Sequence, residues 1–237
     1  MRLDKFISSC TLCTRKEASR AISKGQVLVN GKVVKDKSAE TDAEKDSVVF
    51  NGQVLRYSRY TYIMVNKPEG VVSATEDKQD KTVLDLLPEE MKRLELFPCG
   101  RLDKNTVGLV LMTNNGPLAH FLLSPASHVS KRYSFTVKFP MSEDDLKRLE
   151  QGVDIGGYVT KPCRVSLTGE REGVIILTEG KYHQIKLMMK SVNNQITFLK
   201  RESFGSLTLD PRLEEGGWRY LTDAEIALLH EDTGRIF

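Results

Sequence analysis

The first apolar positions of the chain recur with the period of a helix. Leu3, Phe6 and Ile7 lie at helical spacing, and Thr14 with Glu17 forms a T-x-x-E capping box that opens a second helix. This second helix is expected to turn three apolar residues inward: Ala18, Ala21 and Ile22. The pattern therefore predicts two short helices at the start of the chain.

A small β element is expected to follow the two helices. Gly25 ends the second helix, and Asn30-Gly31 separates two β-type runs in QVLVNGKVV, which is a strong short-range hairpin signal. The acid-rich run SAETDAEKDS is typical of a loop, and VVFNGQVL after it of a closing β element. We therefore expect a small ααβ domain over residues 1–58, with residues 56–60 acting as a linker.

From Thr61 onward, β-type runs outnumber helical ones. Strands rich in β-branched and aromatic residues are expected at 61–67, 107–113, 131–139, 159–167, 173–179, 194–200, 206–210 and 218–221. Helices are expected at 82–87, 117–123, 142–152, 182–192 and 222–230. Because strands outnumber crossover helices, residues 60–237 are predicted to form a mixed, mostly antiparallel β-sheet with flanking helices, so that the whole chain is α+β.

The net charge of +3 conceals an uneven distribution along the 237 residues. Residues 1–37 carry nine basic and three acidic side chains, a balance of +6, which leaves −3 for the rest. The second helix is expected to present its basic residues on the face that the apolar positions leave free: Arg15, Lys16, Arg20 and Lys24. Such a surface suits a phosphate backbone, although a solvated helix face is the simpler alternative.

Composition and short motifs exclude several classes of protein. No apolar window reaches the length of a membrane span and MRLDKFISSC does not resemble a signal peptide, so we expect a cytoplasmic protein. Cys10 and Cys13 are close together, but no second pair of cysteines or histidines completes a zinc site, which favours free thiols. The usual phosphate-binding, dinucleotide-binding, hydrolase-elbow and zinc-protease motifs are missing as well.

One polar cluster stands directly before an apolar run, in GRLDKNTVGLVLM. Its carboxylate, Asp103, must be paired or used if it lies beside a buried strand. On these residues alone, Asp103 is best interpreted as a turn residue with Arg101 as its surface ion partner.

Two further segments could contribute chemistry. KRYSFTVKF places Tyr133 at the start of a strand, where its ring could stack on a nucleobase or simply belong to the core. EGKYHQIKLMM carries Lys186 on a helix whose apolar side is packed, so the ammonium could lie near a carboxylate or in solvent. Neither segment decides its own role.

Several segments in order resemble a known family. RLDKFI, TRKEASRAISKG and VLVNGKVV are similar to the RNA-binding domain named after ribosomal protein S-four. With NKPEG, GRLDKNTVGLVLMTNNG, KRY, EGKYHQIKLMM and FLKRESFG, the chain from Met1 to about Leu229 resembles the RsuA-type family of ribosomal RNA pseudouridine synthases.

The resemblance implies a pseudouridine synthase fold and the isomerisation of uridine to pseudouridine without metal or cofactor. It implies that Asp103 is catalytic, that Tyr133 stacks on the uracil and that Lys186 is the basic partner of Asp103, a position where wider relatives more often have arginine. Arg101 resembles the arginine that fills the gap left by the displaced base. We further expect seven residues to bind RNA: Arg2, Arg15, Lys16, Arg20, Lys24, Asn66 and Lys67.

The motifs look closest to the branch that acts on small-subunit (16S) ribosomal RNA, although the branches acting on large-subunit (23S) RNA share them. The expected partner is ribosomal RNA, and the protein is expected to act as a monomer. Two other classes stay open. A non-catalytic ribosome assembly factor predicts a lost aspartate or tyrosine, and a metal-dependent nuclease predicts clustered acids, for which SAETDAEKDS is the sole candidate.

Overall fold

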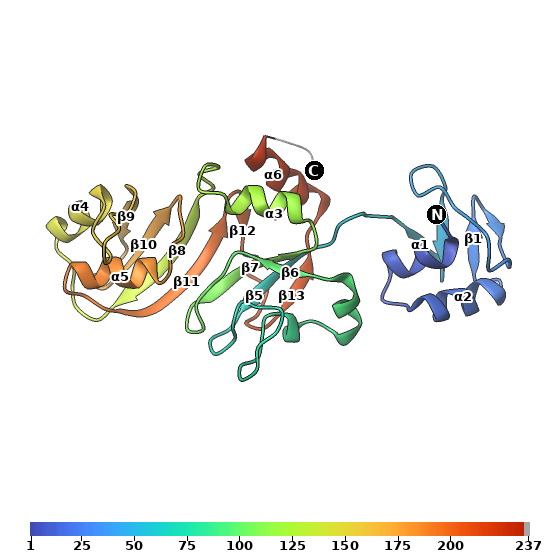
Figure 1. The fold of residues 1–237 in the computed structure, drawn as a ribbon, viewed down its shortest axis with the longest axis horizontal. Coiled ribbons are helices and arrows are strands. Elements are labelled where there is room, and N and C mark those ends of the chain that lie inside the picture. The colour runs from blue at the N-terminus through green and yellow to red at the C-terminus, as the bar shows by residue number, and fades with distance from the viewer. Residues whose placement is uncertain (235–237) are drawn as a thin grey trace. The chain divides into compact units, whose positions relative to one another are not determined.

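A computed structural model describes residues 1–234 of the chain (Figure 1). The chain divides into two compact units, one formed by Met1–Tyr60 with Glu89–Arg93 and the other by Thr61–Pro88 with the chain from Leu94 onward. Within the described residues, no helix combines the length and apolarity needed to cross a bilayer.

The first unit packs two helices against a small antiparallel sheet. Its helices are α1 (Leu3–Cys10) and α2 (Arg15–Ser23), and its strands run in the order β2 (Lys32–Val33), β1 (Val27–Val29), β3 (Val48–Phe50) and β4 (Gln53–Leu55). The predicted capping box is confirmed, because the Thr14 side chain accepts from the Glu17 N–H and the Glu17 carboxylate accepts from the Thr14 N–H. Ala18, Ala21 and Ile22 point into the core as predicted.

The second unit is built on one nine-stranded sheet. Seven of its strands run in the order β13 (Trp218–Tyr220), β5 (Tyr62–Lys67), β7 (Val107–Thr113), β11 (Ile196–Phe204), β8 (Lys131–Val137), β10 (Glu172–Leu177) and β9 (Arg164–Leu167). The short strands β6 (Phe97–Cys99) and β12 (Leu207–Thr208) pair with β7 and β11. All pairs are antiparallel except β7 with β11, which confirms the predicted α+β class with a mixed, mostly antiparallel sheet.

Four helices flank this sheet in two groups, as Figure 1 shows. The helix α3 (Gly116–Leu123) packs against α6 (Asp223–Thr233), while α4 (Glu143–Gln151) contacts β9 and α5 (Gln184–Ser191) contacts β11. Ser142 begins α4 with the capping box that its sequence predicts. These four helices correspond to four of the five that the sequence predicts.

The structure differs from the predicted elements where local signals are weak. The helix expected at 82–87 is a single 3₁₀ turn, Leu84–Leu86, and the strand expected from 159 begins at Arg164, beyond Pro162, which has no N–H for a ladder. The 3₁₀ helix Glu89–Leu94 and the strand β6 were not predicted, because three to six residues are too few for a period to show.

The parallel contact between β7 and β11 requires a glycine. The two strands pair through Lys200 with Val107 and Arg201 with Gly108. Gly108 has a φ of +101°, and a Cβ built on it would lie 2.3 Å from the carbonyl oxygen of Arg201. The close approach brings the loop before β7 against β11, which is where the candidate site lies.

Candidate active site

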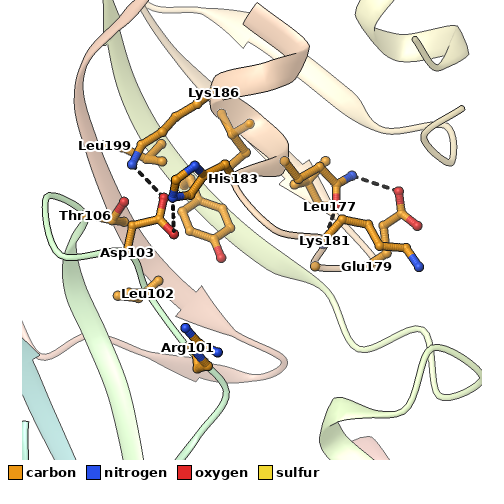
Figure 2. A pocket seen from close by; sticks show the side chains of 14 residues that line it. Arg101, Leu102, Asp103, Thr106, Leu177, Glu179, Lys181, His183, Lys186 and Leu199 are labelled. Carbon is orange, nitrogen blue, oxygen red and sulfur yellow. Dashed lines mark hydrogen bonds and ion pairs between the residues drawn. The ribbon is translucent and has the colours of Figure 1, made fainter. Parts of the chain in front are cut away.

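A pocket opens where the loop before β7, the floor of the sheet and the start of α5 meet (Figure 2). The loop contributes Arg101, Leu102, Asp103 and Thr106, and the strands contribute Tyr133, Leu177 and Leu199. The opposite wall consists of the segment 179–186, without its exposed Tyr182. The pocket therefore gathers Asp103, Tyr133, Lys186 and Arg101, four residues that the sequence singled out.

The backbone around Asp103 is held on both sides. On one side, the Leu102 N–H donates to the Ser73 hydroxyl at 3.0 Å, and that hydroxyl donates to the Leu102 carbonyl at 3.1 Å. On the other side, the Thr106 N–H donates to the Asp103 carbonyl at 3.0 Å. These bonds, together with the buried start of β7, fix the direction in which the carboxylate points.

Lys186 reaches Asp103 from α5. Its Nζ lies 2.6 Å from Asp103 Oδ2 and 2.5 Å from Asn105 Oδ1, so one ammonium joins two side chains of the loop. The side chains of Asp103 and Lys186 are 27% and 23% exposed, which leaves the pair partly shielded from solvent yet accessible from the pocket. The ammonium and the carboxylate therefore form an ion pair that also fixes the direction of the Asp103 side chain.

His183 is a pocket residue that the sequence analysis missed. Its Nε2 lies 3.6 Å from Asp103 Oδ1, on the carboxylate oxygen that Lys186 does not contact (Figure 2). It precedes α5 with a left-handed φ of 49° and stands three residues before Lys186. That i,i+3 spacing places both side chains on one face of the helix start. The spacing is the sequence feature that could have pointed to His183.

Tyr133 lies on the floor of the pocket in β8. It pairs with Ile175 of β10 on one side and with Arg201 of β11 on the other, and it is buried. Leu177 and Leu199 also line the pocket. The floor is thus an aromatic ring between aliphatic side chains, which suits a flat, weakly polar ligand such as a nucleobase.

Glu179, the second carboxylate of the pocket lining, is already engaged. It accepts hydrogen bonds from the Tyr158 hydroxyl at 2.7 Å, the Lys161 N–H at 3.0 Å and the Gln184 amide at 2.7 Å. Burial alone would raise the pKa of Glu179, but these hydrogen bonds outweigh it and hold the pKa below its usual range. Asp103 is therefore the carboxylate that a ligand can meet.

The structure corrects the expectation that Asn66 and Lys67 contact RNA. Lys67 is fully buried, and its Nζ donates to the carbonyls of Pro68 at 3.0 Å and Lys104 at 3.2 Å. Asn66 is buried as well and donates to the Leu213 carbonyl at 2.8 Å. Burial lowers the pKa of Lys67 to about 8, opposed by the negative charge of Asp103. Lys67 therefore braces the backbone next to Asp103 and Asn66 the backbone at Leu213, and neither side chain is exposed.

The basic residues of the first unit remain on its surface. Arg2 and Arg15 are exposed, and both pair with the buried Asp4, at 3.1 and 3.3 Å. Three others are exposed and form no ion pair among the described residues: Lys16, Arg20 and Lys24. The surface of α2 therefore presents positive charge that no close ion pair engages within the described part of the chain.

Two family profiles match the chain. Residues 61–191, which include the whole pocket lining except Leu199, match the profile described as RNA pseudouridylate synthase. Residues 1–44, which include α1, α2 and the β1–β2 hairpin, match the S4 domain.

Individual relatives cover nearly the whole chain. It is 45% identical to the uncharacterized RNA pseudouridine synthase YtzG of Bacillus subtilis, over 98% of this chain and 99% of that protein. It is 37% identical to ribosomal small subunit pseudouridine synthase A of Escherichia coli, over 96% and 99% of the two chains. A crystal structure of a pseudouridylate synthase superposes with a TM-score of 0.69 at 34% identity, over 97% and 99%.

Proposed function

The chain belongs to the RNA pseudouridylate synthase family and is an RNA-modifying isomerase with an S4 domain, and we propose that its substrate is a uridine of small-subunit (16S) ribosomal RNA. The support for this substrate is the relationship to ribosomal small subunit pseudouridine synthases A, such as the Escherichia coli protein, along almost the full length of both chains. We assign residues 1–58 to RNA anchoring and residues 60–237 to the reaction.

The contact between Asp103 and Lys186 at 2.6 Å carries the assignment of the site. Pseudouridine formation breaks the bond between uracil N1 and the ribose and rejoins the ribose to uracil C5. The hydrogen at C5 leaves as a proton and N1 gains one, so the reaction needs no further reactant. Asp103 acts as the ionised carboxylate in this exchange, and Lys186 is the positioning partner that holds its charge and direction.

The target uridine must leave its stack before Asp103 can reach the sugar or the base, which costs a few kcal/mol. Tyr133 offers the extruded uracil a ring to stack on from the pocket floor. Arg101 is exposed at the edge of the same pocket, where it can enter the space that the base vacates. The exposed cations of the first unit supply attraction to phosphates that does not depend on the base sequence.

Tritium release from transcripts that carry [5-³H]uridine measures the exchange at C5 directly. We expect the full-length protein to release tritium from 16S transcripts in EDTA, and carbodiimide-blocked primer extension to map the modification to one uridine. Asp103→Asn keeps the shape of the side chain but loses the charge, and it should lower the rate by ~10³-fold or more. Asp144→Asn, at an exposed acid of α4, is the matched control and should keep full activity.

Other outcomes of these experiments would each contradict a specific part of the proposal. Release from 23S transcripts alone would replace the proposed substrate with large-subunit RNA. Full activity of Asp103→Asn would remove the site assignment. RNA binding without any tritium release would favour a non-catalytic assembly factor, and cleavage that EDTA abolishes would favour a nuclease.

A further inference from the structure

Tyr182 is an aromatic residue that the protein leaves in solvent beside the pocket. Its relative exposure of 76% is the highest of any large hydrophobic side chain in the described part of the chain. Its ring stacks on the His183 imidazole with centroids 3.8 Å apart and planes 20° apart. One face of the phenol ring is therefore covered by the imidazole, while the rest of the side chain meets solvent.

The stacked rings of Tyr182 and His183 extend from solvent to the Asp103 carboxylate. Tyr182 itself does not line the pocket, but His183 does, and its Nε2 lies 3.6 Å from Asp103 Oδ1. The left-handed φ of 49° at His183 costs conformational energy in a non-glycine residue, and it is the backbone conformation that accompanies this pair of stacked rings. Asp103, His183 and Tyr182 thus form a series that leads out of the pocket.

An exposed cation precedes Tyr182. Lys181 Nζ lies 4.4 Å from the centre of the Tyr158 ring, while the Lys186 ammonium, one turn later, is held by Asp103 and Asn105. An exposed ring next to an exposed ammonium suits single-stranded nucleic acid, because the charge can meet a phosphate while the ring meets a base. A tyrosine that served the core would instead be covered.

We propose that the outer face of the Tyr182 ring stacks on the nucleobase next to the target uridine. The proposal rests on the proposed function, since it needs a uridine extruded into the pocket. Extrusion removes one stacking partner from each neighbouring base, and the ring supplies a replacement at the pocket edge. Every base has a π face, so this subsite contributes affinity without selecting a sequence.

Substitutions at Tyr182 test the subsite in the full-length protein with 16S transcripts as the probe. Tyr182→Leu keeps an apolar side chain but removes the ring, and it should raise both KM and the dissociation constant by about fivefold to a hundredfold. The value of kcat should stay within about twofold, because stacking on a flanking base is the same before and during the reaction. Tyr182→Phe should match the wild type, and Tyr182→Trp should bind as tightly or more tightly. Phe139→Leu, at an exposed ring away from the pocket lining, is the control.

Three results would overturn the subsite. An unchanged KM and dissociation constant in Tyr182→Leu would remove it. A lower kcat at constant KM would mean that Tyr182 only supports His183. A loss in Tyr182→Phe equal to that in Tyr182→Leu would mean that the hydroxyl binds instead. If the wild type releases no tritium, the proposed function fails and the subsite beside a target uridine fails with it; a dissociation constant that still rises in Tyr182→Leu would then show only that the ring binds RNA.

Discussion

The two units of the protein use positive charge in opposite ways. In the first unit, three cations are exposed on α2 and at its end; we call these the helix cations: Lys16, Arg20 and Lys24. In the second unit, three cations have relative exposures of 0%, 8% and 2%; we call these the buried cations: Lys67, Lys131 and Arg201. The same residue types are therefore presented to solvent in one unit and built into the scaffold in the other, and burial is what distinguishes them.

The buried cations are bound to carbonyls and not to carboxylates. Arg201 Nε donates to the Leu109 carbonyl at 2.7 Å, and Lys131 Nζ donates to the Val129 carbonyl at 2.9 Å. Both charges lie over the Phe204 ring, 5.4 and 5.5 Å from its centre. No acid pairs with either of them within the described residues. They tie β7, β8 and β11 together beneath the pocket at the cost of desolvating two charges.

Among the buried cations, we expect Arg201→Ala to cause the largest loss of folding stability. It removes the bond to the Leu109 carbonyl and leaves a cavity beside Phe204, so we expect the free energy of unfolding to fall by about 3 kcal/mol. Urea denaturation of the full chain measures it. Lys16→Ala is the matched control from the helix cations and should change the value by less than about 0.5 kcal/mol. Equal effects of the two variants would erase the distinction between the units.

Replacing all three helix cations with glutamine should weaken RNA binding and leave the stability of the fold unchanged. We expect the affinity for 16S transcripts to fall by roughly 10- to 100-fold at low salt. Each phosphate contact releases counterions from the RNA, and this favourable contribution is lost with the contact. The slope of log K against log salt concentration should become shallower by about 2, while the unfolding free energy stays constant. Filter binding across a potassium chloride series tests this. An unchanged slope would show that α2 does not face the RNA.

Lys131→Met should give an effect that is small near neutral pH and grows as the pH rises. Burial lowers the pKa of Lys131 to about 8, assisted by repulsion from Arg201, against 10.5 for an ordinary lysine. Between these values the unfolded chain binds more protons than the folded one, so the wild type gains stability as the pH rises through this window. The stability of Lys131→Met relative to the wild type should therefore decrease by about 3 kcal/mol between about pH 7 and about pH 10.5. A pH-independent difference would mean that Lys131 is not desolvated.

The predictions from sequence succeeded where contacts are local. The capping boxes at Thr14 and Ser142 involve residues three apart, and the β1–β2 hairpin follows from Asn30-Gly31, so a short window contains all the necessary information. The prediction of a helix at 82–87 was wrong. Its apolar residues satisfy a helical pattern, but the structure forms only a 3₁₀ turn there, so the local pattern did not determine this element.

The amino-acid sequence by itself determined the element types, the basic character of the first unit and the identity of the motifs that contain Asp103, Tyr133 and Lys186. Tertiary structure alone decided which charges are buried and which remain exposed. Lys186 and Asp103 are 83 residues apart and meet at 2.6 Å because α5 packs beside β11 and β11 pairs with the start of β7. Lys67 was expected to bind RNA, but it is fully buried in the folded chain. The burial of a side chain and its distance from another depend on contacts between residues far apart in the chain, and no local pattern contains that information.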